Sequence, residues 1–194
     1  MALFKGVVKD RTNADIGWMQ NRSPFYINGY RIAAEKLSEN FGQLSTHEKD
    51  SLIFPIVYLY RQHIELAIKD IIRDICGLVK FKEVIKLDNH DILKLWDKII
   101  LLYMELEKQI SPELSFTNEN ELKRARLVIK EFSNYDSQSF SFRYATDKSG
   151  NRLLDDMDYI SLSNFRKEIE VVLKTIDNLI ETICHEIEFQ SYTL

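Results

Sequence analysis

The segment with the most chemically capable side chains covers residues 60–69 and reads Tyr-Arg-Gln-His-Ile-Glu-Leu-Ala-Ile-Lys. Arg61, Glu65 and Lys69 follow one another at intervals of four, so on a helix they form one stripe in which Glu65 pairs with either cation. The residues around the stripe are apolar, and unpaired charges are costly to bury. Two interpretations stay open: an internal network that fixes the helix register, or a polar pocket at a junction between subunits or domains.

The four histidines lie far apart in the sequence, at positions 47, 63, 90 and 185. His63 is two residues from Arg61, on nearly the opposite side of a helix, where a hydrogen-bonded core histidine is the simpler interpretation. His90 precedes Asp91 at a predicted helix start, where it either packs beside Trp96 or approaches an arginine across the bundle. No CxxC or HExxH pattern accompanies these histidines, so we expect no metal and no cofactor.

A second polar cluster lies outside the predicted helices. Residues 139–144 alternate with period two, and residues 147–151 are rich in turn-forming residues. This pattern predicts a small β-hairpin or an extended insertion over residues 139–152.

Binding groups concentrate in such segments, and four residues here are candidates: Arg143, Tyr144, Asp147 and Lys148. An arginine beside a tyrosine can clamp a phosphate or stack on a base. The alternative is a lid that packs the aromatic residues at 140, 142 and 144 on the bundle, with Asp147 shaping the turn.

The most basic stretch of the chain carries Lys123, Arg124, Arg126 and Lys130. It is either a phosphate-binding face or a solvated helix face, since glutamates are interspersed with the cations.

Five helices are expected to position these groups, over about residues 25–40, 45–77, 91–110, 119–132 and 161–188. Ser23-Pro24 predicts a capped start for the first helix, with proline at its first position. Ser45 and Glu48 form a capping box for the second helix, which Pro55 is expected to kink or restart.

The later helices have similar boundary signals. Asp88 and Asn89 offer the cap of the third helix, and Ser111-Pro112 is expected to end it. The last helix has an apolar seam, formed at alternating intervals of four and three by Phe165, Ile169, Val172, Ile176, Leu179, Ile183 and Ile187.

These elements predict an all-α fold, an antiparallel helical bundle of about five main helices. Residues 1–194 are expected to form a single domain, in which residues 1–22 are an irregular N-terminal arm. The apolar seam and the surplus of apolar residues on the second helix also predict a homodimer.

The composition is that of a globular protein, with 45% hydrophobic and 29% charged residues. The net charge of −4 gives no overall attraction to nucleic acid or to an anionic membrane. The most apolar run, residues 52–60, is too short to span a membrane, and no secretory signal precedes it. Together with two cysteines in apolar contexts, Cys76 and Cys184, this predicts a cytoplasmic protein with reduced thiols and no membrane partner.

The segments at 60–69 and 89–96 together resemble the HEPN-like helical proteins of prokaryotes. There, a helix reading R-H-x-x-E-L-x-x-K is commonly followed by G-H-x-L-x-x-L-W/F; here the second segment reads Asn-His-Asp-Ile-Leu-Lys-Leu-Trp. Residues 141–150 also resemble a segment of uncharacterised bacterial and phage-borne relatives, which usually have proline where Ala145 stands. The resemblance covers roughly residues 23–185.

This resemblance implies an all-α bundle, frequent homodimers, and roles in RNA or nucleotide binding within prokaryotic or phage defence systems. Ribonuclease members of the family carry arginine, four to six further residues, and then histidine. No arginine stands at that spacing before any histidine of this chain. We therefore expect an RNA-, nucleotide- or partner-protein-binding protein without robust ribonuclease activity.

The expected ligand-binding residues are Arg61, Glu65, Lys69, His90, Arg143, Tyr144, Asp147 and Lys148. One alternative is a variant metal-independent ribonuclease, for which Arg61, His63 and Glu65 are the catalytic candidates, joined by Arg143. The other is a structural dimeric adaptor that binds no ligand.

Overall fold

The computed structural model describes residues 6, 9–79, 86–108 and 119–193 of the chain. Five α-helices follow one another: α1 (Ser23–Ser38), α2 (Thr46–Leu78), α3 (Ile92–Glu107), α4 (Glu119–Asp136) and α5 (Leu162–Thr193). A short 3-10 turn, Phe41–Gln43, joins α1 to α2, and the described residues contain no strand. The predicted all-α helical bundle is therefore confirmed.

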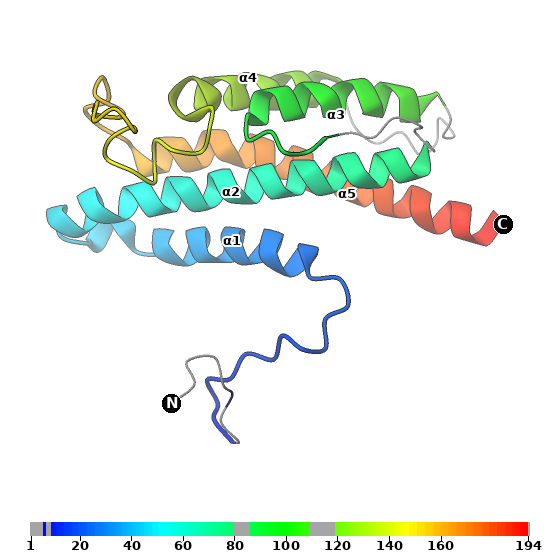
Figure 1. Ribbon diagram of the computed structural model, residues 1–194, viewed down its shortest axis with the longest axis horizontal. Helices are drawn as coiled ribbons and strands as arrows, with labels where there is room; N and C mark the ends of the chain where they lie inside the picture. The colour runs from blue at the N-terminus through cyan, green and yellow to red at the C-terminus, as the bar shows by residue number, and fades with distance from the viewer. Residues whose placement is uncertain (1–5, 7–8, 80–85, 109–118, 194) are drawn as a thin grey trace.

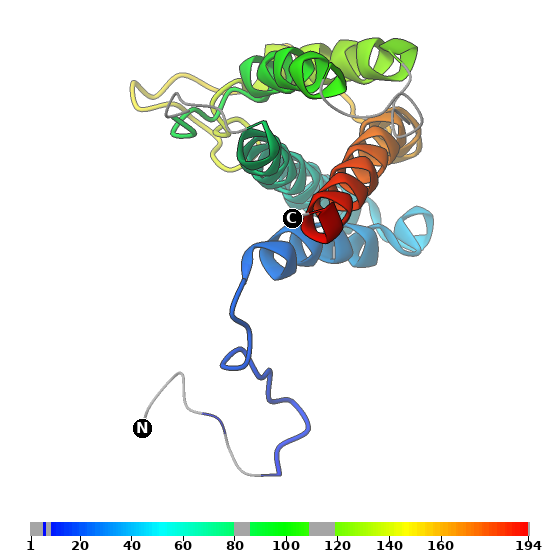
Figure 2. The same cartoon turned by 90° about the vertical axis from the view of Figure 1, so that its right-hand side faces the viewer.

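The helices form three layers (Figures 1 and 2). The two longest helices, α2 and α5, lie in the middle layer, with α1 on one side and with α3 and α4 on the other. α2 contacts α1, α3 and α5 directly, which explains why it is apolar on nearly every face. Its fully buried residues include Ile56, Ile64, Ile68 and Ile72.

Local sequence signals set several helix ends. At α2, the Ser45 hydroxyl accepts a hydrogen bond from the Glu48 amide at 3.3 Å, and the Glu48 carboxylate accepts one from the Ser45 amide at 2.9 Å. This is the predicted capping box. Pro55 lies inside α2, which continues from Thr46 to Leu78 without a restart.

Two predicted caps are wrong. The N-cap of α1 is Arg22, and the Ser23 hydroxyl instead donates to Asp70 on α2 at 2.9 Å. The N-cap of α3 is Asp91, whose carboxylate accepts from the amides of Leu93 and Lys94. The expected stop of α3 at residues 111–112 lies outside the described residues.

The seam of α5 is buried inside the bundle at Ile169, Val172, Ile176, Leu179 and Ile183. α5 packs against α2 and α4 there. The seam is therefore packed within one chain, except near its end, where Ile187 is 42% exposed.

The segment between α4 and α5 is an irregular insertion built from turns, not a paired hairpin; at its start the amides of Arg143 and Tyr144 both donate to the Phe140 carbonyl. Its one β-bridge joins Thr146 and Arg152, and Gly150 has a positive φ of 86° in the turn between them. Without a strand, the aromatic residues do not share one face: Phe142 is buried, whereas Phe140 and Tyr144 are 42% and 54% exposed. The predicted lid of three packed aromatic residues is thus wrong for two of them.

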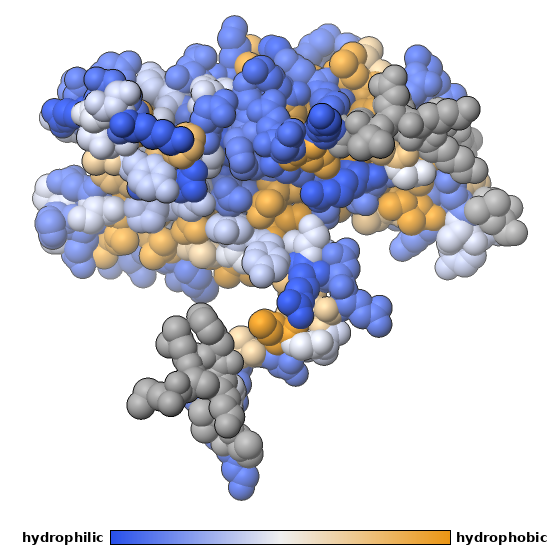
Figure 3. All heavy atoms as spheres, in the orientation of Figure 1, coloured by the Kyte–Doolittle hydropathy of each residue, from blue (hydrophilic) through white to orange (hydrophobic). Residues whose placement is uncertain are grey.

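Residues 9–22 contain no helix or strand and run away from the bundle, as Figures 1 and 2 show. The predicted irregular arm agrees with this described part. No helix among the described residues combines the length and hydropathy needed to cross a membrane. Figure 3 shows small hydrophobic patches among hydrophilic residues along α1 and α2.

Candidate functional site

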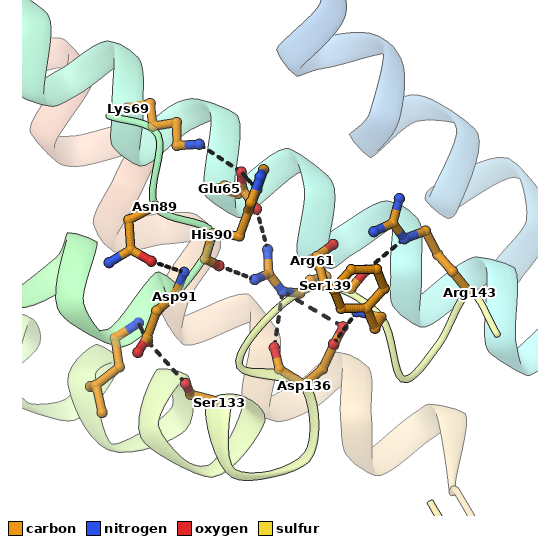
Figure 4. Close-up of polar contacts among 12 residues, drawn as sticks. Arg61, Glu65, Lys69, Asn89, His90, Asp91, Ser133, Asp136, Ser139 and Arg143 are labelled. Atoms are coloured by element: carbon orange, nitrogen blue, oxygen red, sulfur yellow. Dashed lines mark hydrogen bonds and ion pairs between the residues drawn. The ribbon is translucent and has the colours of Figure 1, made fainter. Parts of the chain in front are cut away.

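Glu65 is the centre of a buried ion network on α2 (Figure 4). One of its carboxylate oxygens, Oε2, accepts a hydrogen bond from Arg61 Nη1 at 2.7 Å, and the other, Oε1, accepts one from Lys69 Nζ at 2.8 Å. Arg61 is 0%, Glu65 2% and Lys69 8% exposed. The stripe predicted from the four-residue spacing is therefore confirmed, in the interior of the protein.

Arg61 forms hydrogen bonds that connect α2 to two distant parts of the chain. Its Nη2 donates to the backbone carbonyl of His90, directly before α3. Its Nε donates to the backbone carbonyl of Asp136 at 3.4 Å and lies 3.7 Å from the Asp136 carboxylate, at the end of α4. Because all of these partners belong to the protein and Arg61 is fully buried, its guanidinium is held by the fold and does not face a ligand.

The charges of the network balance. Arg61 and Lys69 oppose the carboxylates of Glu65 and Asp136, so four buried charges sum to zero. Burial alone would raise the pKa of Glu65, but hydrogen bonds from Lys69 and Arg61 outweigh it and leave that pKa below its ordinary value. Glu65 is therefore ionised at neutral pH.

His90 lies at the surface end of this network. Its Nδ1 is 2.8 Å from Glu65 Oε1, while 58% of its side chain is exposed. The buried carboxylate thus fixes the orientation of a solvent-facing imidazole. The approach of His90 to Arg61, which the sequence left open, occurs through the His90 backbone carbonyl.

Arg143 forms an exposed aromatic cluster beside the network. Its guanidinium carbon lies 5.5 Å from the ring centroid of Tyr58, 5.2 Å from that of Phe140 and 5.4 Å from that of Tyr144. Its Nε donates to the Ser139 carbonyl at 2.5 Å, which holds the side chain in place. The three rings and the hydrogen bond fix the position of the Arg143 guanidinium, which lies at the surface.

Asp136 joins the ion network to the aromatic cluster. One of its carboxylate oxygens accepts hydrogen bonds from the amides of Phe140 at 2.7 Å and Ser141 at 3.0 Å. The same residue faces Arg61 on α2. Tyr58, whose ring contacts Arg143, and Lys69 are eleven residues apart on α2, which is about 16 Å along the helix axis. The two clusters are therefore neighbours along α2. We call the whole set the α2 polar face, in which His90, Phe140, Arg143 and Tyr144 are exposed and the other charged residues are buried: Tyr58, Arg61, Glu65, Lys69, His90, Asp136, Phe140, Arg143 and Tyr144.

His63 is not part of this face. Its Nδ1 lies 2.9 Å from the Ile27 carbonyl on α1, so it donates there, and the side chain is buried. Burial lowers the pKa of His63 and keeps the imidazole neutral. The structure therefore does not bring the three catalytic candidates together. Arg61 and Glu65 contact each other, whereas His63 lies on the other side of α2 and packs against α1.

Asp147 and Lys148 are exposed residues of the turn beyond the aromatic cluster. The Asp147 carboxylate accepts hydrogen bonds from the Ser149 amide at 2.8 Å and from the Asn151 amide at 2.9 Å. The side-chain amide of Asn151 also donates to this carboxylate at 2.9 Å, and that bond, ahead of the one from the Asn151 backbone amide, is the main reason that the pKa of Asp147 lies below its ordinary value. Asp147 thus shapes the turn, as the alternative interpretation held.

The predicted basic stretch on α4 divides between structural roles and a shallow groove. Arg126 pairs with Asp97 on α3 at 2.6 Å, and Lys123 pairs with Glu119 at 2.9 Å. Arg124 instead lines a shallow groove with cations of α5, namely Arg166, Lys167 and Lys174. The sequence stretch is therefore not one continuous phosphate-binding face.

Within the described part of the chain, no three histidine, cysteine, aspartate or glutamate side chains come together as metal ligands. Cys76 is partly buried and Cys184 is exposed, and neither forms a disulfide. The apolar contexts of the two cysteines in the sequence indicated buried thiols, and this is wrong for Cys184.

Sequence reasoning missed Asp136 and Tyr58. Asp136 lies beyond the predicted end of α4, and its partners are distant in sequence, so no spacing pattern indicated it. Tyr58 precedes Arg61 by three residues on the same helix face, and that spacing is a signal that could have found it.

No family model, curated protein or solved structure matches the chain.

Proposed function

We propose that the protein is a HEPN-like protein that binds single-stranded RNA or a nucleotide through Arg143 and its aromatic neighbours. The observation that carries this proposal is the guanidinium held over three rings at the surface. Such a group offers donors to a phosphate and ring faces on which bases stack, worth about 1–3 kcal/mol per stacked base.

The rest of the α2 polar face supports the same ligand class. His90 adds an exposed imidazole, whereas the buried Lys69 only holds Glu65 in place. Two separate exposed groups, the Arg143 cluster and His90, favour a short single strand over a mononucleotide. The resemblance to HEPN-like proteins assigns this binding to a prokaryotic or phage defence system.

Fluorescence anisotropy with a labelled single-stranded octaribonucleotide tests the proposal. Arg143→Ala should weaken binding about tenfold, and Arg143→Lys should recover only part of the loss because lysine does not stack as a planar group. Arg152→Ala is the matched control, since Arg152 lies in the same insertion and its side chain is 82% exposed. Equal losses for Arg143→Ala and Arg152→Ala would mean that only general charge matters, and would refute the site.

A second candidate function, RNA cleavage, is favoured by one observation: Glu65 orients the exposed imidazole of His90. A general base held by a carboxylate is the arrangement that phosphodiester cleavage by a metal-independent enzyme uses. However, the arginine beside it, Arg61, is buried and fully engaged, so we expect binding without cleavage. Cleavage by pure protein that is lost in His90→Ala but kept in His185→Ala would establish this second function.

A further inference from the structure

A cavity of about 360 Å³ lies between α4, α5 and the insertion that joins them. In Figure 1 this is the end of the bundle where the chain passes from α4 through the insertion into α5. Its volume lies at the lower end of the range of small-ligand pockets.

The floor of the cavity is apolar and aromatic. Val57, Phe132, Phe142 and Ile169 line it and are buried, with Phe165 beside them. Phe132 meets Phe142 at a centroid distance of 6.0 Å and Phe165 at 5.9 Å, both edge to face. The three rings therefore form an apolar wall along this side of the cavity.

The rim of the cavity is acidic. Four carboxylates line it, from Glu131, Asp156, Asp158 and Glu168, and no lysine, arginine or histidine of the described residues does. None of the four forms an ion pair within the described part of the chain, whereas the neighbouring Asp155 pairs with Arg152. The N-terminus of α5 also borders the cavity, but its partial charge of about +0.5 does not neutralise four carboxylates.

Two tyrosines complete the rim. Tyr135 and Tyr159 line the cavity, and they are 41% and 94% exposed. Tyrosine ring faces attract cations, and the attraction adds to that of the carboxylates. An apolar floor below an acidic and aromatic rim matches a ligand with an apolar stem and a cationic head.

We propose that this cavity binds an organic cation, an ammonium or guanidinium group on an aliphatic stem. The stem lies on the phenylalanine floor, and the head lies among the rim carboxylates. The cation is either a free small amine or an arginine or lysine side chain of a partner protein. This site is separate from the α2 polar face: within the insertion, Phe142 points to the cavity floor while Arg143 next to it belongs to the polar face.

Isothermal titration calorimetry tests the proposal with three probes. Butylguanidinium represents a free cation, an acetylated Gly-Arg-Gly amide represents a partner's side chain, and butylurea is the uncharged analogue of butylguanidinium with the same shape. We expect butylguanidinium, the peptide or both to bind, and butylurea to bind at least about tenfold more weakly because it gains no ion pair. Binding by butylguanidinium alone assigns the site to small amines, and binding by the peptide assigns it to a partner protein.

The double variant Asp158→Asn/Glu168→Gln removes two rim charges and should weaken binding of the cation about tenfold. Asp155→Asn is the matched control, a carboxylate of the same insertion that does not line the cavity, and it should leave binding nearly unchanged. The comparison of charged and uncharged probes uses the unaltered protein, so it stands even if the double variant does not fold. Equal binding of butylurea, no binding of either cation, or full binding by the double variant would each overturn the proposal.

Discussion

Removing either partner of the Arg61–Glu65 pair should destabilise the protein strongly. Glu65→Leu leaves a fully buried guanidinium whose nearest remaining carboxylate, that of Asp136, is 3.7 Å away. Arg61→Met leaves Glu65 with Lys69 and His90, but it also leaves Asp136 without a cation. Loss of one partner from a buried pair costs about 3–5 kcal/mol, which is a large share of the stability of a domain of this size.

The double variant Arg61→Met/Glu65→Leu should lose much less than the sum of the two single changes, because neither charge is left unpaired. We expect a coupling energy of about 2 kcal/mol or more from the thermodynamic cycle. Chemical denaturation followed by circular dichroism measures each free energy of unfolding. The double variant still leaves Asp136 with only its two backbone donors and Lys69 without Glu65, so part of the loss should persist.

α1 supplies a matched control for this cycle. Arg31 and Glu35 have the same residue types and spacing, lie 3.0 Å apart and also have a distant aspartate partner, Asp177. Their side chains are 25% and 45% exposed, so their coupling should stay below about 1 kcal/mol. Additive effects below 1 kcal/mol at Arg61 and Glu65 would refute the assignment of a buried, coupled pair.

Three further predictions concern assembly and stability. With the seam of α5 packed inside the bundle, the resemblance to HEPN-like proteins alone predicts a homodimer, so sedimentation at micromolar concentration should give twice the chain mass of 22.9 kDa, and a mass near 22.9 kDa would contradict it. Because burial lowers the pKa of His63 below its ordinary value of 6.5, the unfolded chain takes up the proton more readily, so the free energy of unfolding should fall as the pH drops through 6.5. Denaturation of His63→Gln over the same pH range should show a smaller slope, and an unchanged slope would assign the effect to another group. Ser45→Ala should cost about 1 kcal/mol in thermal unfolding by removing the capping box of α2, while no loss would mean that this end of the helix is frayed.

The local parts of the site could be predicted from the sequence. Arg61, Glu65 and Lys69 meet because a helix brings residues four apart together, and the apolar residues around them indicated burial. The capping box of α2 follows from equally short-range chemistry. The five helices were also predictable, because their apolar residues recur with helical periodicity.

The non-local parts could not be predicted. Asp136 and His90 reach Arg61 only because α3 and α4 pack over α2, and no spacing in the sequence encodes that contact. The alternating pattern at residues 139–144 indicated a strand, yet a strand needs a partner along its length, and the one bridge of the insertion joins Thr146 and Arg152 outside this stretch. The period of two therefore did not determine which side chains are buried.

A 1H–15N correlation spectrum of the protein, titrated with a short single-stranded RNA, tests the central claim most directly. If the α2 polar face binds RNA, the Nε–H signal of Arg143 and the amide signals of Phe140 and Tyr144 should shift together and saturate. Signals of α1, on the other side of α2, should stay in place. Shifts confined to the groove of Arg124 and Arg166, or no shifts at all, would contradict the proposed site.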